Sequence, residues 1–356
     1  MSKKFTFIEP ELTLESCWRH IILMGMNDKS YKFALGKSLL KLAKEGKTFI
    51  SLDDLAIPFT DFTLDHIEHS PKQGGNAKPP GKFLNACRDF LEDRVGKEVL
   101  LEEAVRNLKI KKSVIQKFHH LAHSRSDVPK TFFEDSRQSQ NGLVLKDELF
   151  SIINSNQENN LNCELEGRWR LVETSWKLNL SYNLIIPFRY DEENKLLYYL
   201  DLDKKRSNIT SAREALNGYQ KGRCFYCFKL ISVLPGNNNT ADVDHFLPHH
   251  LKFNKAIDYL KRVNIDGVWN LVLSCKSCNR GKNGKFGFIP NIRYLERLNK
   301  RNNYLIYSHD PLAKVLMSQT GKTSLKRGKF LNKTWGEAKN LIINEWKASD
   351  ELPNKF

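Results

Sequence analysis

Apolar residues recur at helical spacing along the first part of the chain. In Leu14–Met26 they include Cys17, Trp18 and Ile21, and Tyr31–Lys44 repeats the pattern before Gly46. Spacings of three and four residues place such side chains on one helix face, and glycine is a common helix stop. The pattern predicts helices over 14–26 and 31–44, then at about 82–95, 98–108, 112–124 and 145–154.

The pattern changes after Arg168. The segments Trp169–Val172, Leu178–Phe188 and Leu196–Leu200 alternate or are rich in aromatic and branched residues, which predicts strands. Asp191–Asn194 predicts a hairpin turn between the last two segments. Helical patterns return at about 211–219, 290–305 and 323–347. We predict an α+β protein with a mainly helical N-terminal domain (1–165), a strand-rich connector (166–204), a small mixed domain (205–290) and a basic helical C-terminal extension (291–356).

Positive charge is concentrated in the C-terminal part. Residues 1–200 hold 29 basic and 28 acidic side chains, whereas residues 201–356 hold 28 and 13, so nearly all of the net charge of +16 lies there. This asymmetry indicates a polyanionic partner, most often nucleic acid, and a solvated basic face is the alternative. No run of ~18 apolar residues predicts a membrane span, and the first residues do not resemble a secretory signal. We expect a cytoplasmic protein.

Four of the seven cysteines form two C-x-x-C pairs, Cys224/Cys227 and Cys275/Cys278. Two such knuckles can close one tetrahedral site for a structural Zn²⁺ ion. Because 47 residues separate Cys227 from Cys275, the ion would close the base of an inserted subdomain. Four buried free cysteines are the alternative.

Between and after these pairs lie residues suited to phosphodiester hydrolysis. That reaction needs a base for the attacking water, a cation for the developing charge and a group that holds the base. Neutral histidine suits the first task at pH 7, and carboxylate and amide oxygens suit Mg²⁺. His245, Asp244, Asn279 and Asn270 supply these groups. A structural histidine is the alternative for a lone Asp-His pair, but the flanking cysteine pairs favour a catalytic site.

The stretch from Cys224 to Lys285 resembles an HNH nuclease of the ββα-metal superfamily in its zinc-stapled form. It has, in order, C-x-x-C, D-H with proline three residues on, N-L, and C-x-x-C followed by asparagine and lysine. The segments Asp242–His245 and Asn279–Lys282 also resemble the HNH domain of RNA-guided CRISPR effector nucleases. The resemblance covers about residues 205–290 and implies an HNH nuclease domain there.

The resemblance also implies roles for individual residues. His245 would be the general base, and Asp244 and Asn279 would bind a catalytic Mg²⁺ or Mn²⁺ ion. Asn270 would orient the His245 ring, and Lys282 would lie near the phosphates. Asn279 stands where the family usually has histidine.

Further residues are candidates for DNA contact or for assistance at the site. The basic ones are Arg280, Lys285, Arg297, Lys300 and Arg301, of which the last three share one helical face by spacing. Phe225, Tyr226 and Phe228 either stack on bases or pack around the cysteine knuckle. His249 and His250 either assist His245 or form the polar start of a helix near Leu251.

The sequence thus predicts a metal-dependent HNH endonuclease or nickase that hydrolyses phosphodiester bonds in DNA. Glu15–Ile22 and Ser30–Leu40 resemble the opening of bacterial HNH proteins, some of which lie beside anti-phage defence genes. This implies defence against phage DNA, with the helical N-terminal domain contacting other proteins of the system. The alternatives are a non-cleaving, zinc-stabilised nucleic-acid-binding protein and an RNase or toxin-type nuclease.

Overall fold

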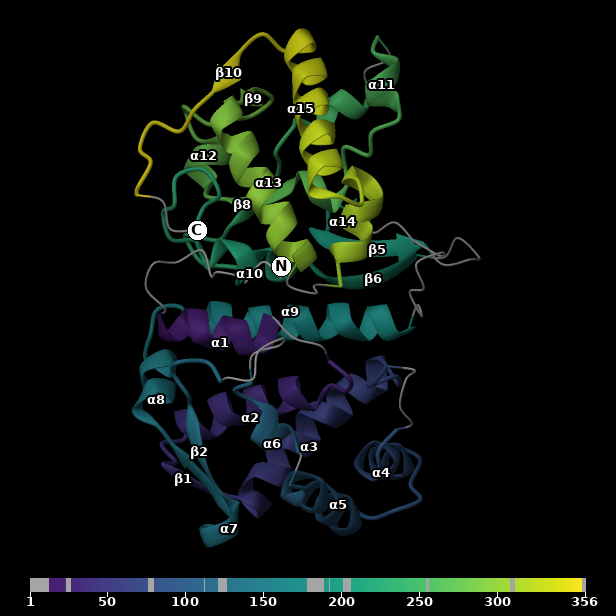
Figure 1. Ribbon diagram of the computed structural model, residues 1–356, viewed down its shortest axis with the longest axis vertical. Helices are drawn as coiled ribbons and strands as arrows, with labels where there is room; N and C mark the ends of the chain where they lie inside the picture. The colour runs from purple at the N-terminus through teal and green to yellow at the C-terminus, as the bar shows by residue number, and fades with distance from the viewer. Residues whose placement is uncertain are drawn as a thin grey trace. The chain divides into compact units, whose positions relative to one another are not determined.

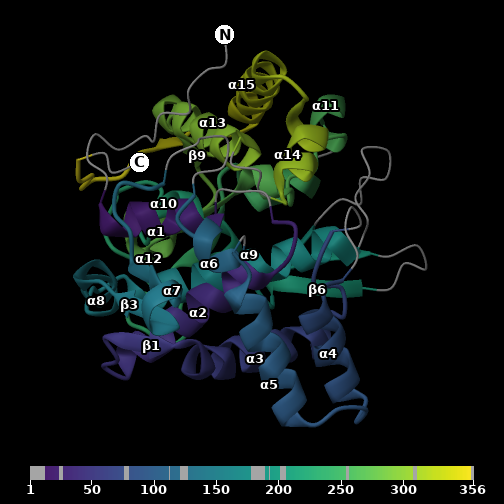
Figure 2. The same cartoon turned by 60° about the horizontal axis from the view of Figure 1, so that its bottom comes forward.

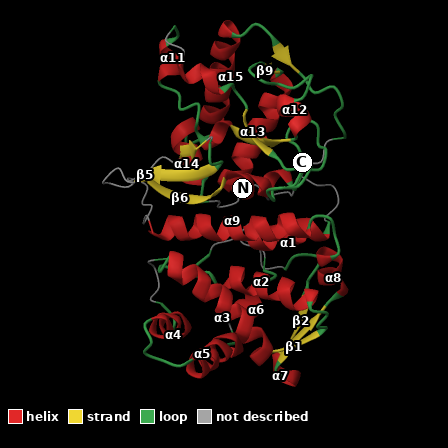
Figure 3. Cartoon of the chain, turned by 180° about the vertical axis from the view of Figure 1, so that it is seen from behind, coloured by secondary structure: helices red, strands yellow, loops and turns green. Residues whose placement is uncertain are grey.

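The computed structural model describes residues 13–23, 27–75, 80–111, 113–120, 127–177, 189–191, 193–200, 206–253, 256–307 and 311–353. The chain divides into two compact units, Met1–Asn179 and Leu180–Phe356. Helices and short strands make it an α+β protein (Figure 3). None of the helices in the described part of the chain is long and apolar enough to cross a lipid bilayer.

The first unit is mainly helical (Figure 1). Its three short strands form an antiparallel sheet in the order β1-β3-β2. Helices α3 and α5 pack side by side (Figure 2). The strands are β1 (Phe49–Ser51), β2 (Phe133–Ser136) and β3 (Gly142–Leu145), and the helices are α1 (Leu14–Leu23), α2 (Tyr31–Lys44), α3 (Leu52–His69), α4 (Lys82–Leu91), α5 (Lys97–Lys109), α6 (Val114–Lys117), α7 (Arg137–Gln140), α8 (Asp147–Ile153) and α9 (Glu158–Lys177).

Helix α9 corrects one sequence prediction. The strand expected over Trp169–Val172 is wrong, because these residues lie within this helix. Leu161, Leu165 and Trp169 are buried at intervals of four residues, so the apolar run continues a helical face that begins before it. The strand expected over 178–188 lies outside the described residues.

Two buried polar groups of this unit, Arg19 and His119, have partners within it. Arg19 donates to both carboxylate oxygens of Glu164, at 2.7 and 2.9 Å. The buried His119 ring accepts a hydrogen bond at Nε2 from the backbone N–H of Phe132, at 3.0 Å. Burial lowers the pKa of His119 to about 4, which keeps the ring neutral. These groups therefore serve the packing of the helical core.

The second unit combines helices with short strands that form small sheets. One sheet has the antiparallel order β4-β5-β6, and the predicted hairpin turn joins β4 to β5. Strand β7 pairs antiparallel with β8, and short β9 pairs parallel with β10. The elements are β4 (Arg189–Asp191), β5 (Leu196–Leu200), β6 (Arg206–Ser211), α10 (Ala212–Gln220), β7 (Asp242–His245), the 3₁₀ turn η1 (His249–Phe253), α11 (Asp258–Lys261), the 3₁₀ turn η2 (Val268–Asn270), β8 (Leu271–Ser274), α12 (Lys276–Arg280), β9 (Ile289–Pro290), α13 (Ile292–Tyr307), α14 (Ala313–Thr320), α15 (Ser324–Leu341) and β10 (Glu345–Trp346).

Candidate functional site

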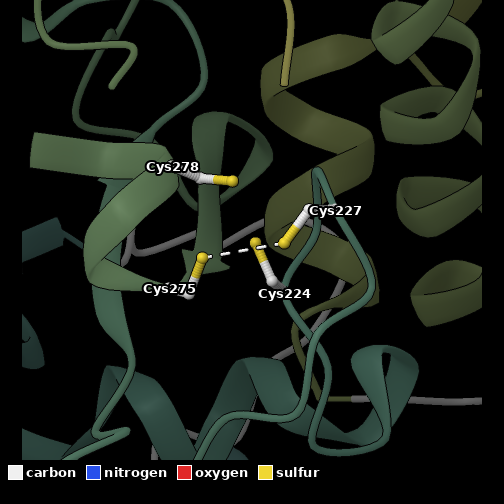
Figure 4. Close-up of side chains that lie close together, drawn as sticks. All are labelled: Cys224, Cys227, Cys275 and Cys278. Atoms are coloured by element: carbon white, nitrogen blue, oxygen red, sulfur yellow. Dashed lines mark hydrogen bonds between the residues drawn. The ribbon is translucent and has the colours of Figure 1, made fainter. Parts of the chain in front are cut away.

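The four predicted cysteines form one cluster. Figure 4 shows their sulfur atoms turned toward one another from two separate segments, and all four lie within 4.8 Å of each other. The Sγ atoms of Cys227 and Cys275 are 3.7 Å apart. A tetrahedral zinc ion with Zn–S bonds of ~2.3 Å requires S···S separations of ~3.8 Å. The cluster can therefore hold a metal ion such as zinc with little rearrangement.

Local backbone geometry builds this cluster. In the first knuckle the N–H of Phe228 donates to the carbonyl of Cys224, and Phe228 has a positive φ of 62°, which closes the turn tightly. The second knuckle begins at Cys275, which caps α12, and the N–H of Cys278 donates back to its carbonyl at 3.1 Å. The N–H of Phe225 donates to Leu273 of β8, which ties the first knuckle to the strand that leads into the second.

The thiols of the cluster favour a bound cation. Burial raises the pKa of Cys224, and hydrogen bonds with the neighbouring thiols raise that of Cys278. Hydrogen bonds from Cys224, Cys227 and Cys278 lower the pKa of Cys275. Without a cation the four groups do not ionise together, whereas a divalent ion offsets half of the charge of four thiolates and binds each of them directly. With four protein ligands the site is closed, which is typical of structural zinc.

Strand β7 and helix α12 lie beside this cluster and both contribute residues to the lining of a pocket, while β8 pairs with β7 and leads into α12. His245 pairs with Leu271 across the two strands, and Asp244 pairs with Val272. Helix α12 contacts β7. The pocket has a volume of about 410 Å³. Its lining includes Asp242, Asp244, His245, His249, Asn279, Arg280, Lys285 and Phe286.

His245 lies at the end of β7 against an unpredicted carboxylate. Its Nε2 atom is 3.2 Å from Oδ1 of Asp266, and Nε2 of His249 is also 3.2 Å from that oxygen. Lys252 holds the other oxygen of Asp266 at 3.3 Å. Burial alone raises the pKa of Asp266, but its bond with His245 and the neighbouring charges lower it overall. Asp266 is thus an anionic group that orients the ring of His245.

Asp244 points toward a different pair of partners. Its Oδ2 accepts a hydrogen bond from the hydroxyl of Tyr226 at 2.7 Å, and its Oδ1 lies 3.2 Å from Nζ of Lys285. Lys285 also donates to the carbonyl of His245 at 3.0 Å. Burial raises the pKa of Asp244, and Lys285 and Tyr226 oppose this rise. Asp244 therefore lies in the pocket wall as a partly neutralised carboxylate.

Asn270 holds backbone rather than the His245 ring. Its Oδ1 accepts from the N–H of Leu247 at 2.8 Å, and its Nδ2 donates to the carbonyls of Leu247 and Ile265, both at 2.9 Å. These bonds join the segment after His245 to the segment before Asp266. The resemblance implies that Asn270 orients the His245 ring directly. In the structure Asn270 acts indirectly, because it fixes the chain segments that carry His245 and Asp266.

Asn279 and Arg280 meet the pocket from helix α12. Nδ2 of Asn279 donates to Oδ2 of Asp242 at 3.2 Å, and Nε of Arg280 lies 3.0 Å from the same oxygen. Asp242 thereby joins the start of β7 to the end of α12. Lys282 is exposed just beyond the helix and is not among the residues that line the pocket.

The prediction that α13 presents a basic face for DNA contact is wrong. Arg301 is only 1 % exposed and donates to the carbonyls of Val268, Trp269 and Leu271. Arg297 donates to the carbonyls of Phe225 and Tyr226 and pairs with Glu351. Only Lys300 of the three is exposed. The shared face is therefore largely an inner one, and its guanidinium groups satisfy buried carbonyls.

Burial also decides two further cases: the predicted DNA contact of Lys285 is wrong, and of the two alternatives for Phe225, Tyr226 and Phe228 the structure shows packing around the knuckle. Lys285 is 1 % exposed and is bound to Asp244 and the backbone, so its ammonium group is not on the surface. Phe225, Tyr226 and Phe228 are buried around the cysteine knuckle. They therefore pack in the interior and offer no surface for base stacking.

Comparison with protein-family models, with curated proteins and with solved structures finds no match to this chain. The site is therefore argued from its own geometry. The sequence gives no signal for Asp266 or for the bond of Tyr226 to Asp244, because neither residue has a fixed spacing to its partner. Asp242 lies in the segment Asp242–His245 but had no predicted role.

Proposed function

We propose that this protein is a metal-dependent HNH endonuclease or nickase that hydrolyses phosphodiester bonds in DNA. One observation carries the proposal: His245 and Asp244 at the end of β7 and Asn279 of α12 border a single pocket. The antiparallel pair β7–β8 is followed by α12, as a ββα-metal domain requires. The cysteine cluster stabilises the base of this segment.

His245 is the general base of this proposal. Its Nε2–H stays on Asp266, so Nδ1 takes the proton of the attacking water. A carboxylate that fixes one ring nitrogen sets the tautomer and stabilises the imidazolium that forms. Asp266 thus supplies the group that holds the base, which the resemblance had assigned to Asn270.

Asp244 and Asn279 are the candidate ligands of a catalytic Mg²⁺ or Mn²⁺ ion. Carboxylate and amide oxygens are hard donors that suit these ions. The ion would stabilise charge on the phosphate and on the leaving oxygen. Because Lys285 neutralises Asp244, we expect weak ion binding that strengthens when substrate phosphate supplies further oxygen ligands.

The charge of the C-terminal part supports a nucleic-acid substrate. Residues 201–356 carry nearly the whole excess of basic side chains, and Arg280 lies exposed at the pocket. We further propose that the activity serves defence against phage DNA and that residues 1–165 contact protein partners. Sequence-independent phosphate contact is the recognition expected from such charge.

Incubation with supercoiled plasmid and with RNA, each with Mg²⁺ or Mn²⁺, tests the proposal. We expect nicked plasmid from the wild type and intact plasmid from His245→Ala. A wild type that shifts plasmid in a gel but leaves it intact supports a non-cleaving nucleic-acid-binding protein instead. Cleavage of RNA alone, abolished by His245→Ala, supports the RNase alternative.

A further inference from the structure

Three side chains that can bind metal meet at one edge of the pocket. They are His245 at the end of β7, His249 at the start of η1 and Asp266 before η2. One ligand atom from each lies within 4.8 Å of the others. Both Nε2 atoms are 3.2 Å from the same carboxylate oxygen. Two imidazoles and a carboxylate thus converge on one point.

The spacing fits a transition-metal ion. Ligands at ~2.1 Å from an ion lie ~3.0 Å apart in octahedral and ~3.4 Å apart in tetrahedral geometry. The observed 3.2 Å falls between these values. We propose that His245, His249 and Asp266 form a second metal site, separate from the cysteine cluster, for zinc or a similar divalent transition-metal ion, here called a zinc-class ion. Two imidazole nitrogens favour such an ion over Mg²⁺.

Asn270 prepares this arrangement before any ion binds. It fixes Leu247, which lies between the two histidines, and Ile265, which directly precedes Asp266. Lys252 holds the second carboxylate oxygen and leaves Oδ1 toward the histidines. Residues that hold the ligands of a site in place strengthen metal binding, whereas the ammonium charge of Lys252 weakens it.

The site has the open form of a reactive or regulatory site. It has three protein ligands, and His245 and His249 both line the pocket, so the remaining coordination positions face solvent or substrate. An ion on Nε2 of His245 leaves the proton on Nδ1, which removes the base from the reaction. Inhibition of nicking by a zinc-class ion is therefore expected, and this consequence alone rests on the proposed function.

Calorimetric titration of the full chain with zinc tests the site. The protein is first loaded with one zinc ion per chain, and the titration is run at about pH 7.5, because metal binding to histidine releases protons and weakens as the pH falls. We expect the wild type to bind one additional zinc ion, also with Mg²⁺ in excess. His249→Ala and Asp266→Asn each remove a direct ligand, so the additional binding weakens by at least about 100-fold, the upper range for residues that only support a ligand.

His250→Ala is the matched control. His250 is the exposed neighbour of His249 and is not part of the cluster, so this variant should bind the additional ion like the wild type. The inference is overturned if the wild type binds no second zinc ion, if His249→Ala and Asp266→Asn bind it unchanged, or if His250→Ala loses it. Thermal melting of each variant verifies that it is folded.

Failure of this inference and failure of the proposed function give different results. Calorimetry requires no nucleic acid, so a protein that binds the second ion but never nicks plasmid contradicts only the nuclease proposal. A protein that nicks plasmid with Mg²⁺ but binds no second ion contradicts only the metal site. If the occupied site leaves the nicking rate unchanged, the inhibitory role is wrong.

Discussion

The second unit holds two clusters of side chains that could bind a metal ion, and they differ in design. Cys224, Cys227, Cys275 and Cys278 supply four sulfur ligands, three of them buried, and leave no position for a substrate. The other cluster, His245, His249 and Asp266, supplies three ligands, two of which line a pocket. Closed sites stabilise folds, and open sites bind or react. On our proposals, the closed cluster holds this unit together and the open cluster meets a ligand.

The largest expected effect comes from opening the closed cluster. Cys224→Ser removes a ligand that joins the first knuckle to the second, so bound zinc is lost and the second unit loses several kcal/mol of folding free energy. Zinc content and thermal melting measure the change. Cys163→Ser in α9 of the first unit is the matched control and should leave the zinc content unaltered. A Cys224→Ser protein with full zinc and unchanged melting would contradict a structural role.

A somewhat smaller effect distinguishes buried from exposed positive charge near the open cluster. Arg301→Met removes the guanidinium that donates to the carbonyls of Val268, Trp269 and Leu271, and we expect a loss of about 2 kcal/mol, as for buried polar groups that lose a hydrogen-bond partner. Lys300→Met on the exposed side should cost less than about 0.5 kcal/mol. Urea unfolding of both variants measures the difference. Equal stability of the two would show that Arg301 is not a structural group.

His119 of the first unit contrasts with the histidines of the open cluster, because it is buried and its Nε2 atom accepts a hydrogen bond from the backbone N–H of Phe132. Its pKa of about 4 lies below the value of 6.5 for an unfolded chain. The unfolded state therefore gains a proton first as the pH falls, so this contribution is complete above pH 6.5 and is lost toward pH 4. By about pH 5 the expected loss is roughly 2 kcal/mol.

His119→Gln isolates this contribution, because glutamine can still accept the bond from Phe132 but does not titrate. The difference in unfolding free energy between variant and wild type should change as the pH falls from 7 to 5. The comparison also cancels His66, whose pKa is raised: burial lowers it, but bonds to Glu166 and Glu173 outweigh burial. A pH-independent difference would show that His119 is not held neutral.

The smallest effect concerns exposed charge beyond the pocket. Lys282→Ala removes one exposed ammonium group without disturbing the fold, so plasmid affinity should fall slightly. The slope of log affinity against log salt should decrease in size by about one, as for one lost phosphate contact. Lys300→Ala tests whether α13 contributes in the same way. An unchanged slope for Lys282→Ala would remove it from the DNA contact.

The sequence predicted local features well and long-range pairings poorly. Spacing alone identified the cysteine cluster, because each C-x-x-C pair forms within one turn. Asp266 lies in a loop 21 residues after His245, and hydrophobic periodicity does not predict which loop residues come into contact with a strand. On α13, Arg297 and Arg301 share a face with the buried Leu298, and spacing cannot distinguish an inner from an outer face. The apolar run Trp169–Val172 alone suits a strand, but with the buried Leu161 and Leu165 before it the spacing is that of a helix face.

The central claim is that the closed cluster holds the fold while the pocket performs the chemistry. The most direct test measures plasmid nicking, zinc at the cysteine cluster and melting temperature on one preparation of His245→Ala. We predict that nicking with Mg²⁺ falls at least about 100-fold, as expected for loss of a general base, while cysteine-bound zinc and melting temperature stay near wild-type values. Wild-type nicking by this variant would contradict the claim, and so would loss of its cysteine-bound zinc.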